Sequence, residues 1–467
     1  MTSKQLFNDF FEGKKVAILG FGREGQSTYH RLRQYLPSLP LVVCDQRPLA
    51  RPPGSYAEDV SVDWFLGDHY LEGLAGADVI IRSPGIPFDV LDNVTHQARI
   101  TSQTELFLTF FRKQVVGITG TKGKSTTASL LYHILREAGQ PALLAGNIGI
   151  PCFDLLDEMD AGVTVVFELS SHQLQHLTVS PSVAVLLNIF EEHLDYYRSF
   201  AAYQEAKMNI FRWQDMNEYF LYDPENPVLN QVLPAISIPS KQIQLSKPEE
   251  DSGGVYCQGE DMVVVTNSGQ EPLVIEQVCH DRLLPGKHNL KNIAAAVGAA
   301  ILKGVSKERV ASAVAGFKGL PHRLEYVGTY RGKQFYNDSI ATIPEAAMAA
   351  VRALPEVSVL ILGGKDRGVA YGPLLRFLAA VPVQTIVFTG EAGRRMLAIA
   401  SGLTGFQQKD CIMAENFDEG VRQAFAKTPE GKICLLSPAA PSYDTFRNFE
   451  ERGDRFRQLI QSFGDQG

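Results

Sequence analysis

The sequence lacks any hydrophobic run long enough to cross a membrane, and it lacks a recognisable secretion signal. Its longest apolar stretches, such as residues 293–302, fall far short of the roughly 20 residues that a membrane-spanning helix needs. The N-terminal residues, MTSKQLFNDFFEGKK, contain no apolar segment bounded by a cleavage site. These two absences predict a cytoplasmic protein without a membrane span.

An excess of positive charge is also absent. The chain has 44 Lys and Arg residues against 52 Asp and Glu, a net charge of -8, which argues against a general nucleic-acid binder because such binders need a basic face. The six cysteines form no C-x-x-C pair and no metal-ligand spacing, so we expect reduced, mostly buried thiols. We therefore expect small molecules, and not nucleic acids, as the partners of this chain. We also expect the chain to be a monomer.

What the chain does contain is the composition of a globular α/β protein. Its 467 residues, 45% of them hydrophobic and 21% charged, predict about three domains with sizeable cores. Short apolar strands alternate with helical patterns, which predicts parallel sheets. The expected strands include residues 16–19, 41–44, 79–81, 115–119, 163–167, 183–187, 357–362, 385–389 and 433–436.

A glycine-rich loop follows the expected strand at residues 115–119. The run GITGTKGKS, residues 117–125, is a variant of the nucleotide-binding P-loop, with Ile118 where G-x-x-x-x-G-K-[ST] has its first glycine. Glycines let backbone N–H groups face phosphate oxygens, Lys124 adds a positive charge, and Ser125 offers a hydroxyl to Mg²⁺. We therefore predict an ATP-consuming enzyme. The predicted ATP contacts in the loop are Gly120, Thr121, Lys122, Gly123, Lys124, Ser125 and Thr126.

This variant loop and later motifs resemble the muramyl (Mur) ligase family over essentially the whole chain. The matching motifs are GNIG (146–149), ELSS (168–171), HLD (193–195), HN (288–289), LPHR (320–323) and NDS (337–339). The ending LLSPAAPSYDTFRNFEERGDRF, residues 435–456, resembles the branch that adds D-glutamate to UDP-N-acetylmuramoyl-L-alanine. The resemblance implies three domains: a Rossmann-like UDP-substrate domain (1–110), a central P-loop domain (111–318) and a Rossmann-like C-terminal domain (319–467).

The resemblance also implies an amide-forming reaction in peptidoglycan precursor synthesis. ATP would convert the substrate carboxylate into an acyl phosphate, which the amine of glutamate would attack. Lys124 would hold the γ-phosphate, Ser125 and Glu168 would bind one Mg²⁺, and His193 would help to bind a second. Lys207 matches the family's lysine that carries a CO₂-derived carbamate, which would turn a cation into a metal-binding anion. This change needs a lysine with a lowered pKa.

The resemblance also implies four nucleotide contacts in the second half of the chain. Asn289 and Asn292 would meet the adenine, Arg323 the γ-phosphate and Asp338 the ribose. Because these residues belong to two expected domains, domain closure would be needed to assemble the site.

The N-terminal glycines allow an alternative. Gly20, Gly22 and Gly25 directly follow a strand and Asp45 ends the next one, which is the dinucleotide-binding fingerprint. An NAD-dependent dehydrogenase is therefore one alternative, and a nucleotide-binding regulator without catalysis is another. In the ligase branch this loop would hold the uracil and the diphosphate of the UDP-sugar. The implied contacts are Gly22, Arg23, Glu24, Asp45, Arg47, Ser83 and Asn147.

The C-terminal segment departs from the D-glutamate branch. Ile340 stands where that branch has lysine, and GGKDR (363–367) differs from the usual spacing between a glycine pair and the lysine that meets glutamate. Lys365 or Arg367 would take that role, since either binds a carboxylate. These departures keep L-glutamate open, although D-glutamate is favoured. The implied glutamate contacts are Lys365, Arg367, Ser442, Tyr443 and Phe449.

Overall fold

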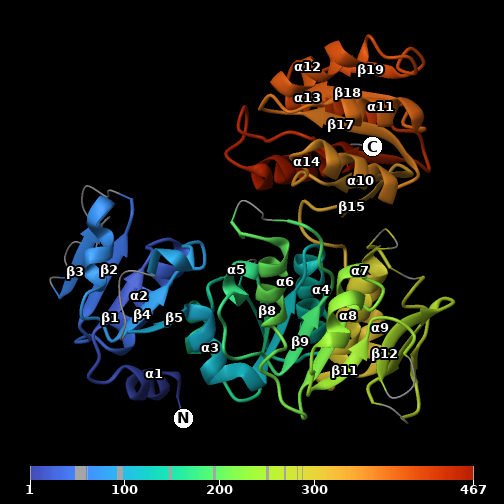
Figure 1. The fold of residues 1–467 in the computed structure, drawn as a ribbon. Coiled ribbons are helices and arrows are strands. Elements are labelled where there is room, and N and C mark those ends of the chain that lie inside the picture. Colours follow the sequence, from blue (N-terminus) through green and yellow to red (C-terminus); the bar gives the residue numbers. More distant parts are fainter. Residues whose placement is uncertain are drawn as a thin grey trace. The chain divides into compact units, whose positions relative to one another are not determined.

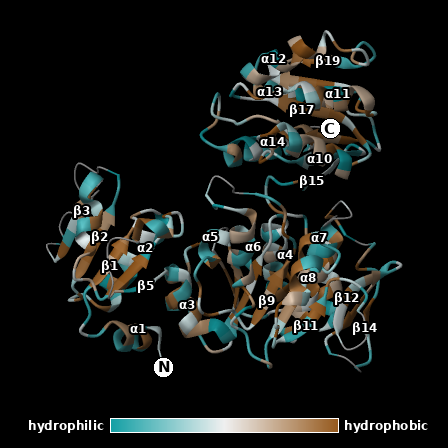
Figure 2. Cartoon of the chain, viewed as in Figure 1, coloured by the Kyte–Doolittle hydropathy of each residue, from teal (hydrophilic) through white to brown (hydrophobic). Residues whose placement is uncertain are grey.

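A computed structural model describes most of the chain, in two compact units. The described residues are 2–47, 59, 61–91, 98–146, 150–192, 196–248, 252–267, 270–280, 282–284, 286 and 288–465. The first unit comprises Met1–Cys279 and Lys291–Ala313, and the second comprises His280–Leu290 and Val314–Gly467. The first unit holds two sheets and the second holds one, and the strands carry the most hydrophobic residues (Figures 1 and 2).

The N-terminal sheet is five-stranded and parallel, with the order β3-β2-β1-β4-β5. Its strands are β1 (Val16–Leu19), β2 (Leu41–Asp45), β3 (Val62–Leu66), β4 (Val79–Arg82) and β5 (Arg99–Thr101), with helices α1 (Ser3–Phe11), α2 (Arg23–Tyr35) and α3 (Gln103–Phe111). The strand order reverses at β1, where β2 lies on one side and β4 on the other. In such sheets ligands bind at the carboxyl ends of the strands beside this reversal.

The central sheet has nine strands in the order β14-β13-β12-β11-β10-β9-β6-β8-β7. Its strands are β6 (Val115–Thr119), β7 (Ala142–Gly146), β8 (Thr164–Glu168), β9 (Val183–Leu186), β10 (Tyr219–Tyr222), β11 (Lys241–Gln244), β12 (Gly253–Gln258), β13 (Asp261–Val265) and β14 (Leu273–Ile275). Its helices are α4 (Lys124–Glu137), α5 (Ser171–Leu174), α6 (Phe200–Met208), α7 (Pro227–Val232), α8 (His288–Leu302) and α9 (Lys307–Gly316). Strand β13 pairs antiparallel with both β12 and β14, and the other described strand pairs of this sheet are parallel. The order reverses at β6, the strand that leads into the glycine-rich loop.

The C-terminal sheet has six strands in the order β15-β16-β20-β17-β18-β19. Its strands are β15 (Glu325–Tyr330), β16 (Lys333–Asn337), β17 (Val357–Gly363), β18 (Thr385–Thr389), β19 (Asp410–Met413) and β20 (Ile433–Leu436), with helices α10 (Pro344–Ala353), α11 (Gly372–Ala380), α12 (Gly390–Ala400), α13 (Phe417–Lys427) and α14 (Phe449–Asp465). Apart from the antiparallel β15, the described strands are parallel. The expected α/β class is confirmed.

One expectation about the cysteines is wrong. Cys257 and Cys279 form a disulfide, whereas Cys44, Cys152, Cys411 and Cys434 are free. The β12–β13 hairpin explains the pairing, because it turns the chain back at Glu260 and the backbone N–H of Cys279 donates to the Glu260 carbonyl at 2.9 Å. None of the described helices combines the length and the apolar character that crossing a bilayer requires.

Candidate active site

The glycine-rich loop turns into helix α4 at Lys124. Gly123 precedes the helix with a φ of 88°, a left-handed conformation that glycine adopts without strain. A Cβ atom at Gly123 would lie 2.3 Å from Oδ1 of Asn292 on α8, so a larger residue would displace the Asn292 side chain. The loop meets the N-terminus of α4, the end of a helix at which backbone N–H groups can bind an anion. The predicted nucleotide residue Asn292 therefore lies against the phosphate loop.

Two lysines meet at this loop. Nζ of Lys124 donates to the carbonyl oxygens of Gly120 at 2.9 Å and Thr121 at 3.1 Å. Nζ of Lys207, on α6, donates to the Gly120 carbonyl at 2.9 Å and lies 4.9 Å from the ring centre of Tyr203. Burial lowers the pKa of Lys207 well below its usual value, and the charge of Lys124 lowers it further. This environment favours the neutral amine of Lys207.

Glu168 ends strand β8 beside the loop strand β6. The parallel register pairs it with Ile118, and the Glu168 side chain is fully buried. The hydroxyl of Ser125, in the first turn of α4, is a second oxygen donor at this edge of the sheet. Mg²⁺ binds proteins through one or two such oxygens together with substrate phosphates, so Glu168 and Ser125 fit this ion. The described residues contain no cluster of three or more His, Cys, Asp and Glu side chains arranged for a metal.

The loop after β1 forms one surface with the residue that follows β4. Gly20 has a φ of 93°, and a Cβ atom at Gly25 would lie 2.0 Å from the Gly20 carbonyl oxygen. The third glycine of the motif therefore lets α2 approach the strand. The Ser83 hydroxyl donates to the same carbonyl at 3.0 Å. The predicted substrate residues at the two strand ends are thus neighbours.

Asp45 and Arg47 form a pair at the end of β2. Arg47 Nε lies 3.0 Å from Asp45 Oδ1, and the backbone N–H of Phe21 donates to Asp45 Oδ2 at 2.6 Å. Burial raises the pKa of Asp45, but the hydrogen bonds from Arg47 and Phe21 outweigh burial and leave this pKa lowered. The ionised Asp45 therefore fixes Arg47, whose side chain is exposed.

A pocket of about 670 Å³ in the first unit is lined both by the loops after β1 and β4 and by residues around the glycine-rich loop. Its lining from the N-terminal sheet is Gly22, Arg23, Glu24, Ser83, Pro84 and Gly85. Its lining from the central sheet is Lys124, Gly146, Pro151, Ser170, Ser171, His172, Gln173, Tyr203 and Lys207. Predicted substrate contacts and two predicted catalytic lysines therefore face one cavity.

Gln173 and Tyr203 are among the lining residues of this pocket that the sequence analysis did not name. Gln173 caps α5 together with Ser170, and the spacing S-x-x-Q is a readable capping-box signal. The Tyr203 hydroxyl lies 3.0 Å from Thr121 Oγ1, a contact between α6 and the glycine-rich loop. No sequence spacing indicates this second contact.

In the second unit, Asp338 follows strand β16 and is buried. The Ser437 hydroxyl donates to its Oδ2 at 2.8 Å and the backbone N–H of Leu324 donates to its Oδ1 at 3.2 Å. Burial raises the pKa of Asp338 to about 7, although these bonds and the charge of Arg323 act in the opposite direction. Arg323 is exposed, and Asn289 is buried in the first turn of α8.

All of the predicted glutamate residues except Phe449 lie on the loops after β17 and β20. Lys365 is exposed and pairs with Glu391 at 2.9 Å. The guanidinium of Arg367 lies over the Tyr443 ring, 5.6 Å from its centre, and joins the two loops. Ser442 is buried, and Phe449 begins α14. Arg367 and Tyr443 thus form one exposed surface, whereas Lys365 already has an acidic partner.

Arg452, which the sequence analysis also missed, holds these loops together. Its side chain is buried and donates to the hydroxyl of Ser339 at 2.9 Å and to the carbonyl oxygens of Ser339 at 2.8 Å and Ala440 at 3.0 Å. A longer bond of 3.4 Å reaches the Gly363 carbonyl. Burial lowers the pKa of Arg452 to about 10. One side chain therefore connects the carboxyl ends of β16, β17 and β20.

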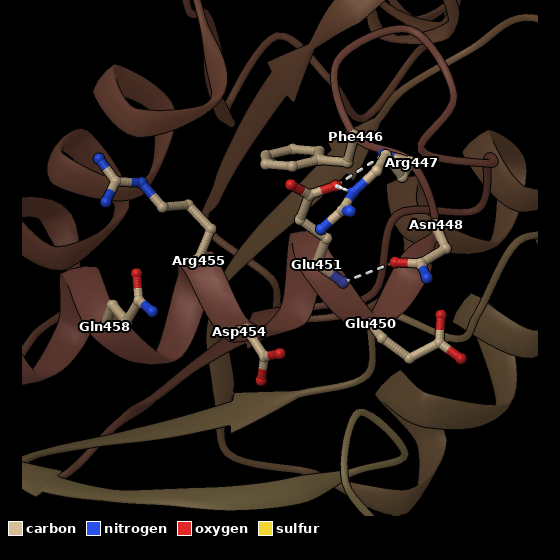
Figure 3. A pocket seen from close by; sticks show the side chains of 8 residues that line it. All are labelled: Phe446, Arg447, Asn448, Glu450, Glu451, Asp454, Arg455 and Gln458. Carbon is tan, nitrogen blue, oxygen red and sulfur yellow. Dashed lines mark hydrogen bonds and ion pairs between the residues drawn. The ribbon is translucent and has the colours of Figure 1, made fainter.

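A second pocket, of about 430 Å³, lies along the beginning of α14 (Figure 3). Its lining residues are Phe446, Arg447, Asn448, Glu450, Glu451, Asp454, Arg455 and Gln458. Arg447 pairs with Glu451 at 3.2 Å, and Arg455 pairs with Asp418. None of these residues is a predicted site residue, and the two arginines already have acidic partners.

Asn147 and His193 lie outside the described residues, so their predicted roles stay predictions.

Comparisons with known proteins agree on one family. Residues 118–300 match the Mur ligase middle domain, and residues 322–440 match the Mur ligase glutamate ligase domain. A UDP-N-acetylmuramoylalanine–D-glutamate ligase from Geobacillus kaustophilus is 35% identical over 460 residues, covering 97% of this chain and 98% of that protein. A UDP-N-acetylmuramoyl-L-alanine–L-glutamate ligase from Salinispora tropica is also 35% identical, over 457 residues, covering 96% and 98%.

A solved structure gives the same result for the fold. MurF from Acinetobacter baumannii matches with a TM-score of 0.57 and 16% identity, covering 100% of this chain and 93% of that one. The dehydrogenase alternative raised by the N-terminal glycines is not favoured, because relatives that share nearly the whole chain are ligases.

Proposed function

Because the chain belongs to the Mur ligase family, we propose that it joins glutamate to UDP-N-acetylmuramoyl-L-alanine in an ATP-dependent step of peptidoglycan precursor synthesis. The products are the extended peptide, ADP and phosphate. The reaction takes place in the cytoplasm, with the chain working as a monomer. All three substrates are small molecules.

The observation that carries this proposal is the shared pocket of the first unit. A substrate whose UDP-sugar lies along Gly22 and Ser83 extends its carboxylate toward Lys124 and Lys207. A carboxylate held there meets the γ-phosphate of ATP at the glycine-rich loop. Positioning and charge neutralisation are the main requirements of phosphoryl transfer.

The roles of the residues follow from their positions. Lys124 neutralises charge on the transferred phosphoryl group, which forms an acyl phosphate on the substrate carboxylate. The amine of glutamate then attacks the acyl carbon and releases phosphate. Mg²⁺, held by Ser125 and Glu168, with His193 at a second ion, would neutralise phosphate charge when bound.

Lys207 is proposed to carry a carbamate. Its lowered pKa favours the neutral amine, which adds to CO₂ and releases one proton. ¹³C-bicarbonate should give one carbamate resonance in the wild-type protein and none in Lys207→Ala. A wild-type spectrum without this resonance would remove the carbamate from the proposal.

The remaining contacts are proposed by position in the motifs. The UDP-substrate contacts are Gly22, Arg23, Glu24, Asp45, Arg47, Ser83 and Asn147. The ATP contacts outside the glycine-rich loop are Asn289, Asn292, Arg323 and Asp338. The glutamate contacts are Lys365, Arg367, Ser442, Tyr443 and Phe449.

D-glutamate is the proposed amino acid, and L-glutamate is the second candidate. The second candidate is retained because the L-glutamate ligase of Salinispora tropica is as similar to this chain as the D-glutamate ligase of Geobacillus kaustophilus. The exposed Tyr443 beside Arg367 is one position where the two enantiomers would differ in fit.

The test is phosphate release from ATP and Mg²⁺ with UDP-N-acetylmuramoyl-L-alanine, in separate reactions with D-glutamate, L-glutamate and no amino acid. We expect release and a new dipeptide product with D-glutamate alone. Product with L-glutamate alone would show that L-glutamate, and not D-glutamate, is the substrate. No product with either, in a protein that binds ATP, would reject the ligase proposal.

A further inference from the structure

Glu24 lines the shared pocket, and one of its two carboxylate oxygens has no hydrogen-bond partner among the described residues. Glu24 lies in the first turn of α2 and lines the pocket beside Gly22 and Ser83. Its Oε1 accepts a hydrogen bond of 2.9 Å from Nε2 of Gln173. Its Oε2 is buried and has no such partner within the described part of the chain. A buried oxygen without a partner is costly to desolvate, so a ligand that supplies a hydrogen bond to it is favoured.

The orientation of this carboxylate is fixed from the opposite side of the pocket. Gln173 accepts hydrogen bonds at its Oε1 from the backbone N–H of Ser170 at 3.0 Å and from the Ser170 hydroxyl at 3.1 Å. This leaves Nε2 of Gln173 directed at Glu24. Gln103 holds the backbone of the same turn through the Glu24 carbonyl at 3.2 Å. The carboxylate is therefore held in place before any ligand binds.

The charge of Glu24 decides what it can meet. An ionised carboxylate repels the diphosphate of a UDP-sugar, whereas Lys124 and Lys207 in the same pocket attract anions. Burial raises the pKa of Glu24 above its usual value, although the hydrogen bond from Gln173 and the charges of Arg23 and Arg82 act in the opposite direction. The ionised form is therefore favoured at alkaline pH. A carboxylate in this setting binds a neutral N–H or O–H group better than it binds a phosphate.

We propose that Glu24 is a specificity-determining residue whose Oε2 accepts a hydrogen bond from an N–H or O–H of the muramoyl-alanine part of the donor substrate. Gln173 is the positioning residue that holds the carboxylate for this contact. The inference rests on the proposed function, because it names a contact to that donor. It differs from the role implied by the family resemblance, in which this loop meets only the uracil and the diphosphate.

The test is Glu24→Gln, measured at pH 8. The new amide keeps an oxygen for Gln173 and turns its NH₂ group toward the pocket, so a donor would face a donor. Because hydrogen bonds to charged groups are strong, we expect the KM for UDP-N-acetylmuramoyl-L-alanine to rise about 10- to 100-fold. The KM values for ATP and glutamate should stay within twofold, and so should the affinity for UDP alone.

Glu12→Gln is the matched control, since Glu12 is exposed at the end of α1 in the same unit. It should leave every constant unchanged. A donor KM unchanged in Glu24→Gln would overturn the inference. An equal loss of UDP affinity, or a loss for ATP as well, would also overturn it, because Glu24 would then act on the nucleotide or on the fold. If the wild-type protein itself makes no product, the proposed function fails rather than this inference.

Discussion

The carboxyl edges of the central and C-terminal sheets hold their charged residues in different ways. At the central edge, Nζ of Lys124 and Nζ of Lys207 donate hydrogen bonds to a backbone carbonyl oxygen of the glycine-rich loop. At the C-terminal edge, Lys365 pairs with Glu391, and Arg395 pairs with Asp366 at 3.2 Å. The first arrangement suits a polyphosphate, which brings only negative charge. The second suits an amino acid, which carries both signs and can exchange partners with existing pairs.

The largest expected effect is at the central edge. Lys124→Ala should lower kcat about a thousandfold, because it removes a positive charge from the site where phosphoryl charge develops. Lys122→Ala should cost less than about tenfold, because the Lys122 side chain is exposed and pairs with Glu192. Initial rates of phosphate release measure both. Similar rates in the two variants, with melting temperatures like that of the wild type, would contradict the different roles assigned to Lys124 and Lys122.

A smaller effect at the C-terminal edge separates Lys365 from Arg367. Arg367→Ala should raise the KM for glutamate about 10- to 100-fold, as expected when a bound carboxylate loses its charged partner. Lys365→Ala should raise it only about threefold, because Lys365 is exposed and paired. The measurement is the glutamate dependence at saturating ATP. The reverse order would assign the carboxylate contact to Lys365.

Asp338 is the exception at the C-terminal edge, because its carboxyl group is buried and its pKa is raised to about 7. Its unfolded value is near 4, so the protonated form stabilises the fold fully below about pH 4, and that stability is lost as pH rises through 7. Asp338→Asn cannot ionise. Between pH 5 and pH 8, the free energy of unfolding should therefore fall by about 1–3 kcal/mol less in Asp338→Asn than in the wild type.

The measurement is urea unfolding at both pH values. Equal losses in the two proteins would show that Asp338 is already ionised at pH 5. The control is Asp410→Asn, since Asp410 is partly exposed and pairs with Lys427.

The parts of the fold that local sequence decides were predictable. The glycine-rich loop, the helix beginning at Lys124 and the close packing at Gly25 follow from residue types and their spacing. Strands at residues 16–19 and 115–119 follow from apolar runs between loops. These features depend on neighbours within a few residues.

Features that depend on distant segments were not predictable. Arg452 reaches the carbonyl and hydroxyl of Ser339, 113 positions earlier, and no spacing in the chain indicates that contact. The Cys257–Cys279 disulfide was missed because it depends on the register of the β12–β13 hairpin. Lys365 was predicted as a glutamate contact, but its partner Glu391 becomes visible only when β17 and β18 pair.

The central claim is that the substrate carboxylate is activated by phosphoryl transfer at the glycine-rich loop. The most direct test uses UDP-N-acetylmuramoyl-L-alanine labelled with ¹⁸O in its carboxylate. Turnover with ATP, Mg²⁺ and D-glutamate should release phosphate that carries one ¹⁸O from that carboxylate, as an acyl phosphate requires. Phosphate free of ¹⁸O, released alongside the dipeptide product, would contradict the account.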